Sequence, residues 1–352
     1  MRSAQNPVRV ILGDDSGFIR ILLSDYLRKD EAVKLIALAA NGKEVVDLSL
    51  KHQPDVVITD LVMPEYDGLY AVKSIMQQRP VPIVLLSSLS RTDPKVFEAL
   101  TAGAAEFMGK PQGQPAANGL YAQRLLRLVK GLADSHMQYP SPAPGMKTIL
   151  PPNVLAKKAT HVHDVVVIGA STGGPAVLEQ LISHLPATMP VPILVAQHMP
   201  ASFIEAFAKR LNQYSALPVS VATHGQELQP GRVFLAGGQQ NLKVVAPTRE
   251  GGWPKVEYTS DTWVEFNNPS VDCLFESAVS VYGSKTMGVL LSGMGKDGGA
   301  GMQKIYQAGG ITLAQDEATC VVFGMPGYAL AQKAVHKLIP APELPHEILK
   351  HL

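Results

Sequence analysis

Hydrophobic positions in the first third of the chain follow two alternating patterns. Short β-branched runs predict buried strands, and between them apolar residues recur at helical spacing. The predicted strands are 8–13, 54–60, 82–88 and 105–111, and the predicted helices are 18–29, 69–78, 94–103 and 120–132. Because strands that alternate with helices form parallel sheets covered on both faces, this part is predicted to be an α/β domain.

The alternation stops at a proline-rich segment and then resumes. Proline removes backbone donors, so SHMQYPSPAPGMKTILPPNVLAKK is predicted to be a linker. After it, the predicted strands are 165–170, 192–197, 286–293 and 310–315, and the predicted helices are 175–185, 201–213 and 300–309. Turn signals at His224–Gly225 and Pro230–Gly231 predict a β-hairpin insertion in this part. The expected organisation is a first domain at 1–131, a linker at 132–162 and a doubly wound parallel-sheet α/β domain at 163–352.

Composition narrows the class of protein. Of the 352 residues, 46% are hydrophobic and 17% are charged, and the formal net charge is +1. Such a small charge creates no strong field for nucleic acid or for an anionic membrane. Cys273 and Cys320 form neither a zinc motif nor a disulfide framework. With no apolar signal segment and no run near the ~20 apolar residues of a membrane span, we expect a cytoplasmic protein that neither binds nucleic acid nor inserts into a membrane.

Carboxylates stand at the ends of two predicted strands in the first domain. Asp14 and Asp15 follow the first of these strands, and Asp60 ends the second. In a parallel sheet such ends meet at one edge, where the acids repel one another unless they share a divalent cation, and oxygen-only ligation suits magnesium. Each acid could instead cap the helix that follows it. Ser87 and Lys110, at later strand ends, favour the first interpretation, because a hydroxyl and an ammonium group could bind a phosphorylated aspartate.

These residues belong to a recognisable series of motifs. DDS, TDLVMPEYDG, SS and GKP, in this order, resemble the motifs of response-regulator receiver domains over about residues 7–131. The resemblance implies a flavodoxin-like fold in which Asp60 is the phosphoacceptor. It also implies magnesium ligands at Asp14, Asp15 and Asp60, phosphate contacts at Ser87 and Lys110, and an aromatic switch at Phe107. Gly13 stands where an apolar residue is commoner, and we expect it to loosen packing rather than to alter the chemistry.

The stretch VVVIGASTGGP, residues 165–175, ends a predicted strand in a turn of small residues before a helix. Such a turn could hold the phosphate of a nucleotide at the helix N-terminus. However, it is not GxGxxG, and the next strand ends in Gln197 and His198 instead of the acid that a dinucleotide site requires. The pattern GxSxG favours the alternative, in which Ser171 is a nucleophile.

Three residues suited to hydrolysis follow separate predicted strands of the second domain. They are Ser171, His198 and Asp297, the last in a glycine-rich turn. A serine hydroxyl needs an adjacent imidazole, and the imidazole needs a carboxylate that fixes its tautomer. The triad residues occur in the chain order Ser, His, Asp, whereas α/β-hydrolases have the order Ser, Asp, His. This difference indicates a triad on a sheet other than that of the α/β-hydrolases. Separately, the serine could cap a helix, the histidine could be a packed side chain and the aspartate could stabilise its turn.

Six motifs of the second domain carry a more specific resemblance. They are IGASTGGP, AQHMP, PGRVFLAGG, PSVDCLF, LSGMGKDGGAGM and AQDEATCVVFGMP. Together they resemble the catalytic domain of the chemotaxis protein-glutamate methylesterase family, CheB, and with the receiver and linker the resemblance covers nearly the whole chain. It implies a nucleophile at Ser171, a general base and then acid at His198, an orienting carboxylate at Asp297, and an oxyanion hole near Thr172 and Met294.

Two segments depart from the family's pattern. Gly237–Asn241 replaces a proline and a charged, histidine-containing stretch, and Phe266–Asn268 stands where basic residues often precede PSVD. We expect neither segment to touch the triad. Both are expected to lie in loops that could line the approach of the substrate.

The resemblance implies an enzyme that hydrolyses glutamate methyl esters on methyl-accepting chemoreceptors and releases methanol. It implies deamidation of receptor glutamines as well, with no cofactor for the esterase chemistry and with activation when a CheA-type histidine kinase phosphorylates Asp60. Two alternatives stay open: an esterase for another protein in a divergent chemosensory pathway, and a non-catalytic signalling adaptor. The complete set of Ser171, His198 and Asp297 speaks against the adaptor.

Overall fold

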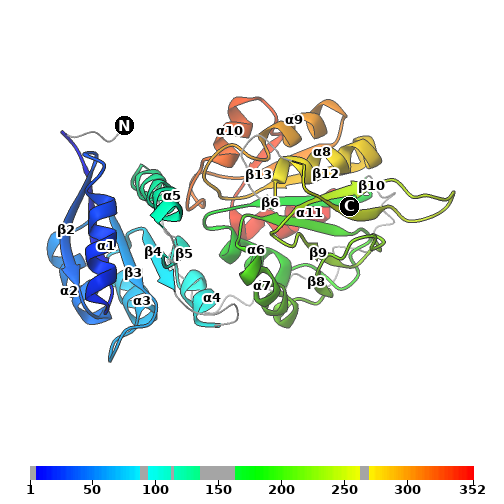
Figure 1. Cartoon of the computed structure of the whole chain (residues 1–352). Coiled ribbons are helices and arrows are strands. Elements are labelled where there is room, and N and C mark those ends of the chain that lie inside the picture. Colours follow the sequence, from blue (N-terminus) through cyan, green and yellow to red (C-terminus); the bar gives the residue numbers. More distant parts are fainter. Residues whose placement is uncertain (1–4, 88–93, 112–114, 135–162, 262–268) are drawn as a thin grey trace. The chain divides into compact units, whose positions relative to one another are not determined.

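The structure of the protein is a computed structural model of the chain (Figure 1). It describes residues 5–87, 94–111, 115–134, 163–261 and 269–352. These residues group into two compact units, one within 1–142 and the other within 143–352. Most of the expected linker, residues 135–162, lies outside the described residues. So does Phe266–Asn268, the second segment that departs from the family's sequence pattern.

The first unit is a parallel sheet of five strands with helices between them. Its strands are β1 Val8–Gly13, β2 Val33–Ala39, β3 Val56–Asp60, β4 Ile83–Ser87 and β5 Glu106–Gly109, and its helices are α1 Gly17–Leu27, α2 Gly42–His52, α3 Gly68–Gln78, α4 Pro94–Thr101 and α5 Pro115–Ala133. The strand order β2-β1-β3-β4-β5 is that of the flavodoxin-like fold, which confirms the predicted fold class. Strands β3 and β4 are buried along their whole length, as their apolar runs predict.

Gly13 does not loosen the packing, and our expectation for it was wrong. A Cβ atom at this position would lie 2.2 Å from Val45 Cγ2, so the side chain of α2 already occupies the space. Val45 itself is fully buried. A glycine at the end of β1 therefore lets α2 pack closely on the sheet.

The second unit is a larger parallel sheet with helices and a separate hairpin. Its strands are β6 Val165–Ala170, β7 Ile193–Gln197, β8 Val219–Val221, β9 Val233–Leu235, β10 Asn241–Val245, β11 Lys255–Thr259, β12 Thr286–Leu290, β13 Ile311–Gln315 and β14 Lys337–Ile339. Its helices are α6 Gly174–Ser183, α7 Ala201–Tyr214, α8 Val271–Tyr282, α9 Gly299–Gln307, α10 Met325–Ala331 and α11 Leu344–Lys350, with 3-10 turns at Gly283–Lys285 and Ala341–Glu343. Seven strands pair in the order β14-β13-β12-β6-β7-β9-β8, and every pair is parallel. The predicted doubly wound sheet is confirmed.

The β-hairpin exists, but not where the turn signals placed it. Strands β8 and β9 pair with each other in parallel, so the turns at His224–Gly225 and Pro230–Gly231 belong to the connection between them. Parallel strands need a crossover and cannot be joined by a tight turn. The hairpin is formed by the antiparallel strands β10 and β11 (Figure 1).

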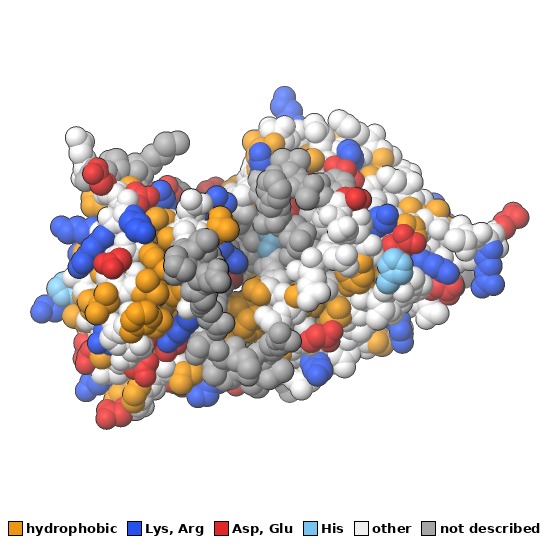
Figure 2. Space-filling model, in the orientation of Figure 1, with side chains coloured by type: hydrophobic (Ala, Val, Ile, Leu, Met, Phe, Trp, Pro, Cys, Tyr) orange, Lys and Arg blue, Asp and Glu red, His pale blue; other side chains and the backbone are white. Residues whose placement is uncertain are grey.

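Strands β12, β6 and β7 lie at the centre of the second sheet, and their side chains are buried from end to end. Large aromatic side chains fill the space between this sheet and its helices, among them Phe207, Phe234 and Phe275, all fully buried. Figure 2 shows acidic and basic side chains interspersed over the visible face of this unit. In the part of the chain that the structure describes, none of the helices combines the length and the hydrophobicity of a membrane span.

Candidate active site

The ends of the three central strands bring Ser171, His198 and Asp297 to one edge of the sheet. Ser171 follows β6, His198 follows β7, and Asp297 lies in the loop after β12. Backbone pairing continues beyond the strands, since the N–H of His198 donates to the carbonyl of Ala170 at 2.9 Å and that of Ser171 donates to Ser292 at 3.0 Å. The sequence therefore folds so that the three loops begin side by side.

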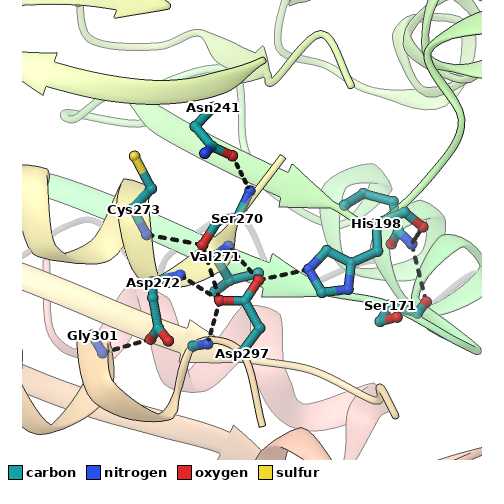
Figure 3. A network of polar contacts seen from close by, with 11 residues as sticks. Ser171, His198, Asn241, Ser270, Val271, Asp272, Cys273, Asp297 and Gly301 are labelled. Atoms are coloured by element: carbon teal, nitrogen blue, oxygen red, sulfur yellow. Dashed lines mark hydrogen bonds and ion pairs between the residues drawn. The ribbon is translucent and has the colours of Figure 1, made fainter. Parts of the chain in front are cut away.

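His198 and Asp297 form a close hydrogen-bonded pair. The distance between His198 Nε2 and Asp297 Oδ2 is 2.7 Å, and the carboxylate is 2% exposed. Figure 3 shows the imidazole between Asp297 and Ser171. Because Nε2 is engaged by the carboxylate, Nδ1 is the ring nitrogen left to accept a proton from a serine hydroxyl.

The carboxylate of Asp297 is held by the start of α8. It accepts hydrogen bonds from the N–H groups of Val271 and Asp272 at 2.8 and 2.9 Å, and from the hydroxyl of Ser270 at 3.1 Å. Burial opposes ionisation of Asp297, but the hydrogen bonds from His198 and from this backbone outweigh it and lower the pKa of the carboxyl. The side chain is thus a fixed anion directed at the imidazole.

These supports of Asp297 were not predicted from the sequence. Ser270 is the N-cap of α8, and its position just before an apolar helical run is the signal that could have revealed it. Asp272 is mostly buried, and its Oδ1 accepts from Gly301 N at 2.7 Å. Burial, followed by the nearby charges of Asp297 and Glu276, raises the pKa of Asp272 to about 7.

Gln197 links the serine loop to the histidine loop. Its side chain is 2% exposed, and Nε2 donates to the carbonyl oxygens of Ser171 and His198, both at 3.0 Å. One amide group therefore fixes the relative position of two backbone segments. This role of Gln197 was not predicted from the sequence.

Ser171 is almost buried, and its hydroxyl has no structural partner among the described residues. The N-cap of α6 is Gly173, in the left-handed conformation with φ 79°, so the serine does not cap this helix. No hydrogen bond joins Ser171 Oγ to His198 here, although the two side chains lie close together in Figure 3. Such contacts often tighten only when substrate binds.

Thr172 and Met294 lie in the two loops beside Ser171. Thr172 is 3% exposed, and its carbonyl accepts a bond from Ser292 Oγ at 2.7 Å. Met294 is half-buried, and within the described part of the chain its N–H has no acceptor. The two loops are therefore tied together close to the serine.

The segment Gly237–Asn241, which departs from the family's sequence pattern, lies closer to the site than expected. A Cβ atom at Gly238 would be 2.9 Å from Ala201 Cα and 3.0 Å from the carbonyl oxygen of Met199, so the segment packs on the chain just after His198. At its other end, Asn241 Oδ1 accepts from Ser270 N at 2.7 Å (Figure 3). The segment does not touch the triad directly, but one residue separates it from Asp297.

A second polar site lies at the strand ends of the first unit. Lys110 Nζ is 2.8 Å from Asp14 Oδ2 and 2.7 Å from Asp60 Oδ2. Burial raises the pKa of Asp60, the contact with Lys110 opposes this rise, and Asp14 adds to it. Burial lowers the pKa of Lys110, but its two carboxylate partners outweigh this effect and raise it.

The remaining predicted residues of the first unit lie around this site. Ser87 ends β4 and is 3% exposed, and its carbonyl oxygen accepts from Lys110 N at 2.9 Å. Phe107, on β5, is 2% exposed. The structure therefore places Ser87 and Lys110 on adjacent strand ends, while the ring of Phe107 lies inside the unit.

The acids of the first unit fit a small divalent cation. Asp14, Asp15 and Asp60 each offer one carboxylate oxygen, and these oxygens all lie within 4.8 Å of one another. Two of the three carboxylates are buried, where their mutual repulsion needs a counter-charge. An all-oxygen set of this kind suits magnesium.

Comparisons with known proteins agree with the two units. The profile of CheB methylesterase matches residues 166–348, and that of the response regulator receiver domain matches residues 10–117. A protein-glutamate methylesterase/protein-glutamine glutaminase of Archaeoglobus fulgidus is 38% identical over 347 residues, covering 98% of each chain. One of Thermotoga maritima is 36% identical over 349 residues, covering 97% of this chain and 98% of the relative.

A solved structure resembles the second unit. The crystal structure of the Thermotoga maritima CheB methylesterase catalytic domain superposes with a TM-score of 0.52 and 38% identity. It covers 54% of this chain and 99% of its own length. The matches to the family profile and to nearly full-length relatives lead to one conclusion: the chain belongs to the CheB methylesterase family.

Proposed function

We propose that this enzyme hydrolyses glutamate methyl esters on methyl-accepting chemoreceptors by a Ser171–His198–Asp297 mechanism and releases methanol. The observation that supports this most is the 2.7 Å contact between His198 Nε2 and the buried carboxylate of Asp297. His198 follows β7, the strand that pairs with β6, which ends just before Ser171. We place the esterase at residues 163–352, after a receiver domain at 1–131 and a linker at 132–162.

The first half of the reaction forms an acyl-enzyme. Ser171 Oγ attacks the ester carbonyl carbon while its proton passes to His198 Nδ1, and Asp297 stabilises the resulting imidazolium. The oxyanion accepts hydrogen bonds from the N–H groups of Thr172 and Met294. The imidazolium then gives its proton to the departing methoxide, which leaves as methanol.

The second half regenerates the serine. A water molecule loses a proton to His198 and attacks the acyl carbon, and the returning proton releases Ser171 and the glutamate side chain. Deamidation of receptor glutamines follows the same path with ammonia as the leaving group, because both reactions pass through a tetrahedral oxyanion at the same carbonyl carbon.

The first domain regulates the esterase through Asp60. A CheA-type histidine kinase in the cytoplasm transfers a phosphoryl group to this carboxylate, and Ser87 and Lys110 contact it. Phe107 is the switch position. Magnesium held by Asp14, Asp15 and Asp60 would neutralise the phosphoryl oxygens. The added charge shifts a two-state equilibrium toward the active form.

We propose that the phosphodonor binds over exposed apolar side chains on α1. Phe18 is 72% exposed and Ile21 is 66% exposed, and both lie on α1, which begins just after Asp15. Figure 2 shows hydrophobic side chains gathered on the visible face of the first unit. A partner that covers this face would bury apolar area next to the acidic site.

Methanol release from receptor-containing membranes tests the proposal. We expect the purified protein to release methanol from membranes with methylated receptors, and to release it faster after treatment with acetyl phosphate and magnesium. Membranes whose receptors carry no methyl groups are the control. If no methanol forms in either condition, the chain is not an esterase for these receptors.

A methyl group added at Gly293 should slow the same reaction. The Cβ atom would lie 2.2 Å from Met325 Sδ and 2.8 Å from Ser171 Cβ, so the serine would be displaced. We expect Gly293→Ala to lower kcat for methanol release about 10-fold or more and to reduce the melting temperature. Gly119→Ala is the control, because open space surrounds that position in α5. Wild-type kcat in Gly293→Ala would contradict the close packing of Gly293 on Ser171.

A further inference from the structure

Asn241 is a buried polar side chain with a partner on each side. It is the first residue of β10 and is 1% exposed. Its Oδ1 accepts from Ser270 N at 2.7 Å, and its Nδ2 donates to the carbonyl of Asp261 at 2.9 Å. An amide side chain supplies the acceptor and the donor on two separate atoms, and the two partners fix which way it points.

The partner Ser270 leads directly to Asp297. Ser270 caps α8, accepting from Cys273 N at 3.2 Å, while its hydroxyl donates to Asp297 Oδ1 at 3.1 Å. The next two N–H groups of α8 also donate to Asp297. Three of the hydrogen bonds that hold this carboxylate thus come from the start of α8. Asn241 in turn accepts a hydrogen bond from the N–H of Ser270, the N-cap of this helix.

The segment that carries Asn241 also contacts the other half of the pair. Gly238, with φ 79°, packs against Met199 and Ala201, immediately after His198. Asn241 at its far end reaches Asp297 through Ser270. The segment thus contacts the loop of the imidazole at one end and the helix that holds the carboxylate at the other.

We propose that Asn241 is a positioning residue for ester hydrolysis, acting through Ser270 to fix the carboxylate of Asp297 against His198. This inference rests on the proposed function of the triad. Without Asn241, the buried N–H of Ser270 loses its acceptor, so the start of α8 must shift to find another. A shift of the helix start moves three donors of Asp297 together and misplaces the carboxylate.

Kinetics of Asn241→Ala test the proposal. We expect kcat for methanol release to fall about 10-fold or more while KM changes little, because the carboxylate acts on the proton transfer and not on binding. Asn212→Ala is the control for the loss of such a hydrogen bond: Asn212 Oδ1 also accepts from a backbone N–H, that of Val219 at 2.8 Å, but this residue is exposed and lies on α7. A kcat in Asn241→Ala equal to that of wild type, or an equal loss in Asn212→Ala, overturns the proposal.

A spectroscopic measurement separates positioning from a loss of stability. The proton between His198 Nε2 and Asp297 should give a strongly deshielded NMR resonance, identified by its absence in His198→Gln. Asn241→Ala should move or broaden this resonance, and Asn212→Ala should leave it in place. An unchanged resonance in Asn241→Ala overturns the proposal even if kcat falls.

Two further variants, Asn241→Thr and Ser171→Ala, complete the kinetic test of Asn241. If Asn241→Ala does not fold, Asn241→Thr serves instead, since threonine suits a strand but lacks the carbonyl that reaches Ser270. Ser171→Ala is measured in parallel. If Ser171→Ala keeps its activity, the proposed function fails; if it is inactive while the Asn241 variants match wild type, only the role of Asn241 fails.

Discussion

Replacing Ser171 with alanine should reduce methanol release at least about 10³-fold, because the proposed nucleophile is then absent and only substrate binding and the oxyanion hole still contribute to the rate. The hydroxyl makes no hydrogen bond within the described residues, and Gly173 is the N-cap of α6. Its removal therefore takes no structural contact from the fold. We expect the melting temperature to change by no more than about 3 °C.

The matched control for this variant lies at the other end of the same helix. Ser183 ends α6, and its hydroxyl donates to the carbonyl of Gln180 at 3.0 Å. Ser183→Ala should retain the wild-type rate. Methanol release and thermal unfolding are measured on both variants. If Ser171→Ala releases methanol at a rate near that of wild type, another residue is the nucleophile and the proposed triad is wrong.

The central strands of both sheets could be predicted because they are buried on both faces. The partly exposed edge strands β2 and β14 were not predicted. Continuous apolar runs such as those of β4 and β6 leave few other interpretations, and helices between them require parallel pairing. The position of the hairpin could not be predicted in this way. Glycine and proline mark a turn at 224–225 and at 230–231, but they do not say whether the strands on either side pair in parallel.

The candidate site was predictable only for side chains with a distinctive chemistry. Ser171 and His198 follow apolar strands, and the register of β6 with β7 makes their meeting a consequence of topology. The N–H groups of Val271 and Asp272 that hold Asp297 leave no mark in the sequence, since almost every residue has such a donor. Their role follows only from where α8 begins.

Contacts between distant segments were the hardest to anticipate. Asn241 and Ser270 are 29 positions apart, and the amide of Asn241 looks from sequence like an ordinary loop residue. The role of Gly13 depends on Val45, a side chain from another element. In both cases the structural role of the residue depends on the side chains that pack against it. A single sequence does not reveal these tertiary contacts.

A phosphoryl group on Asp60 would enter a site in which three carboxylates already face the single ammonium group of Lys110. Lys110 lies within 2.8 Å of both Asp14 and Asp60, and Asp15 is the exposed acid of the cluster. The new negative charge must compete for Lys110 and for the cation, so the contacts among these residues have to rearrange. This rearrangement is the local event that we expect to bias the esterase.

Replacing Asp60 with asparagine should therefore abolish stimulation by acetyl phosphate and leave the basal rate of methanol release unchanged. An amide accepts no phosphoryl group, and it also removes one of the three charges available to magnesium. The matched control is Asp47→Asn, an exposed aspartate on α2, which should be stimulated like wild type. Chelation of magnesium should remove the stimulation of wild type as well. A variant at Asp60 that acetyl phosphate still activates would show that the phosphoacceptor lies elsewhere, because then the charge that drives the switch would not arise at the end of β3.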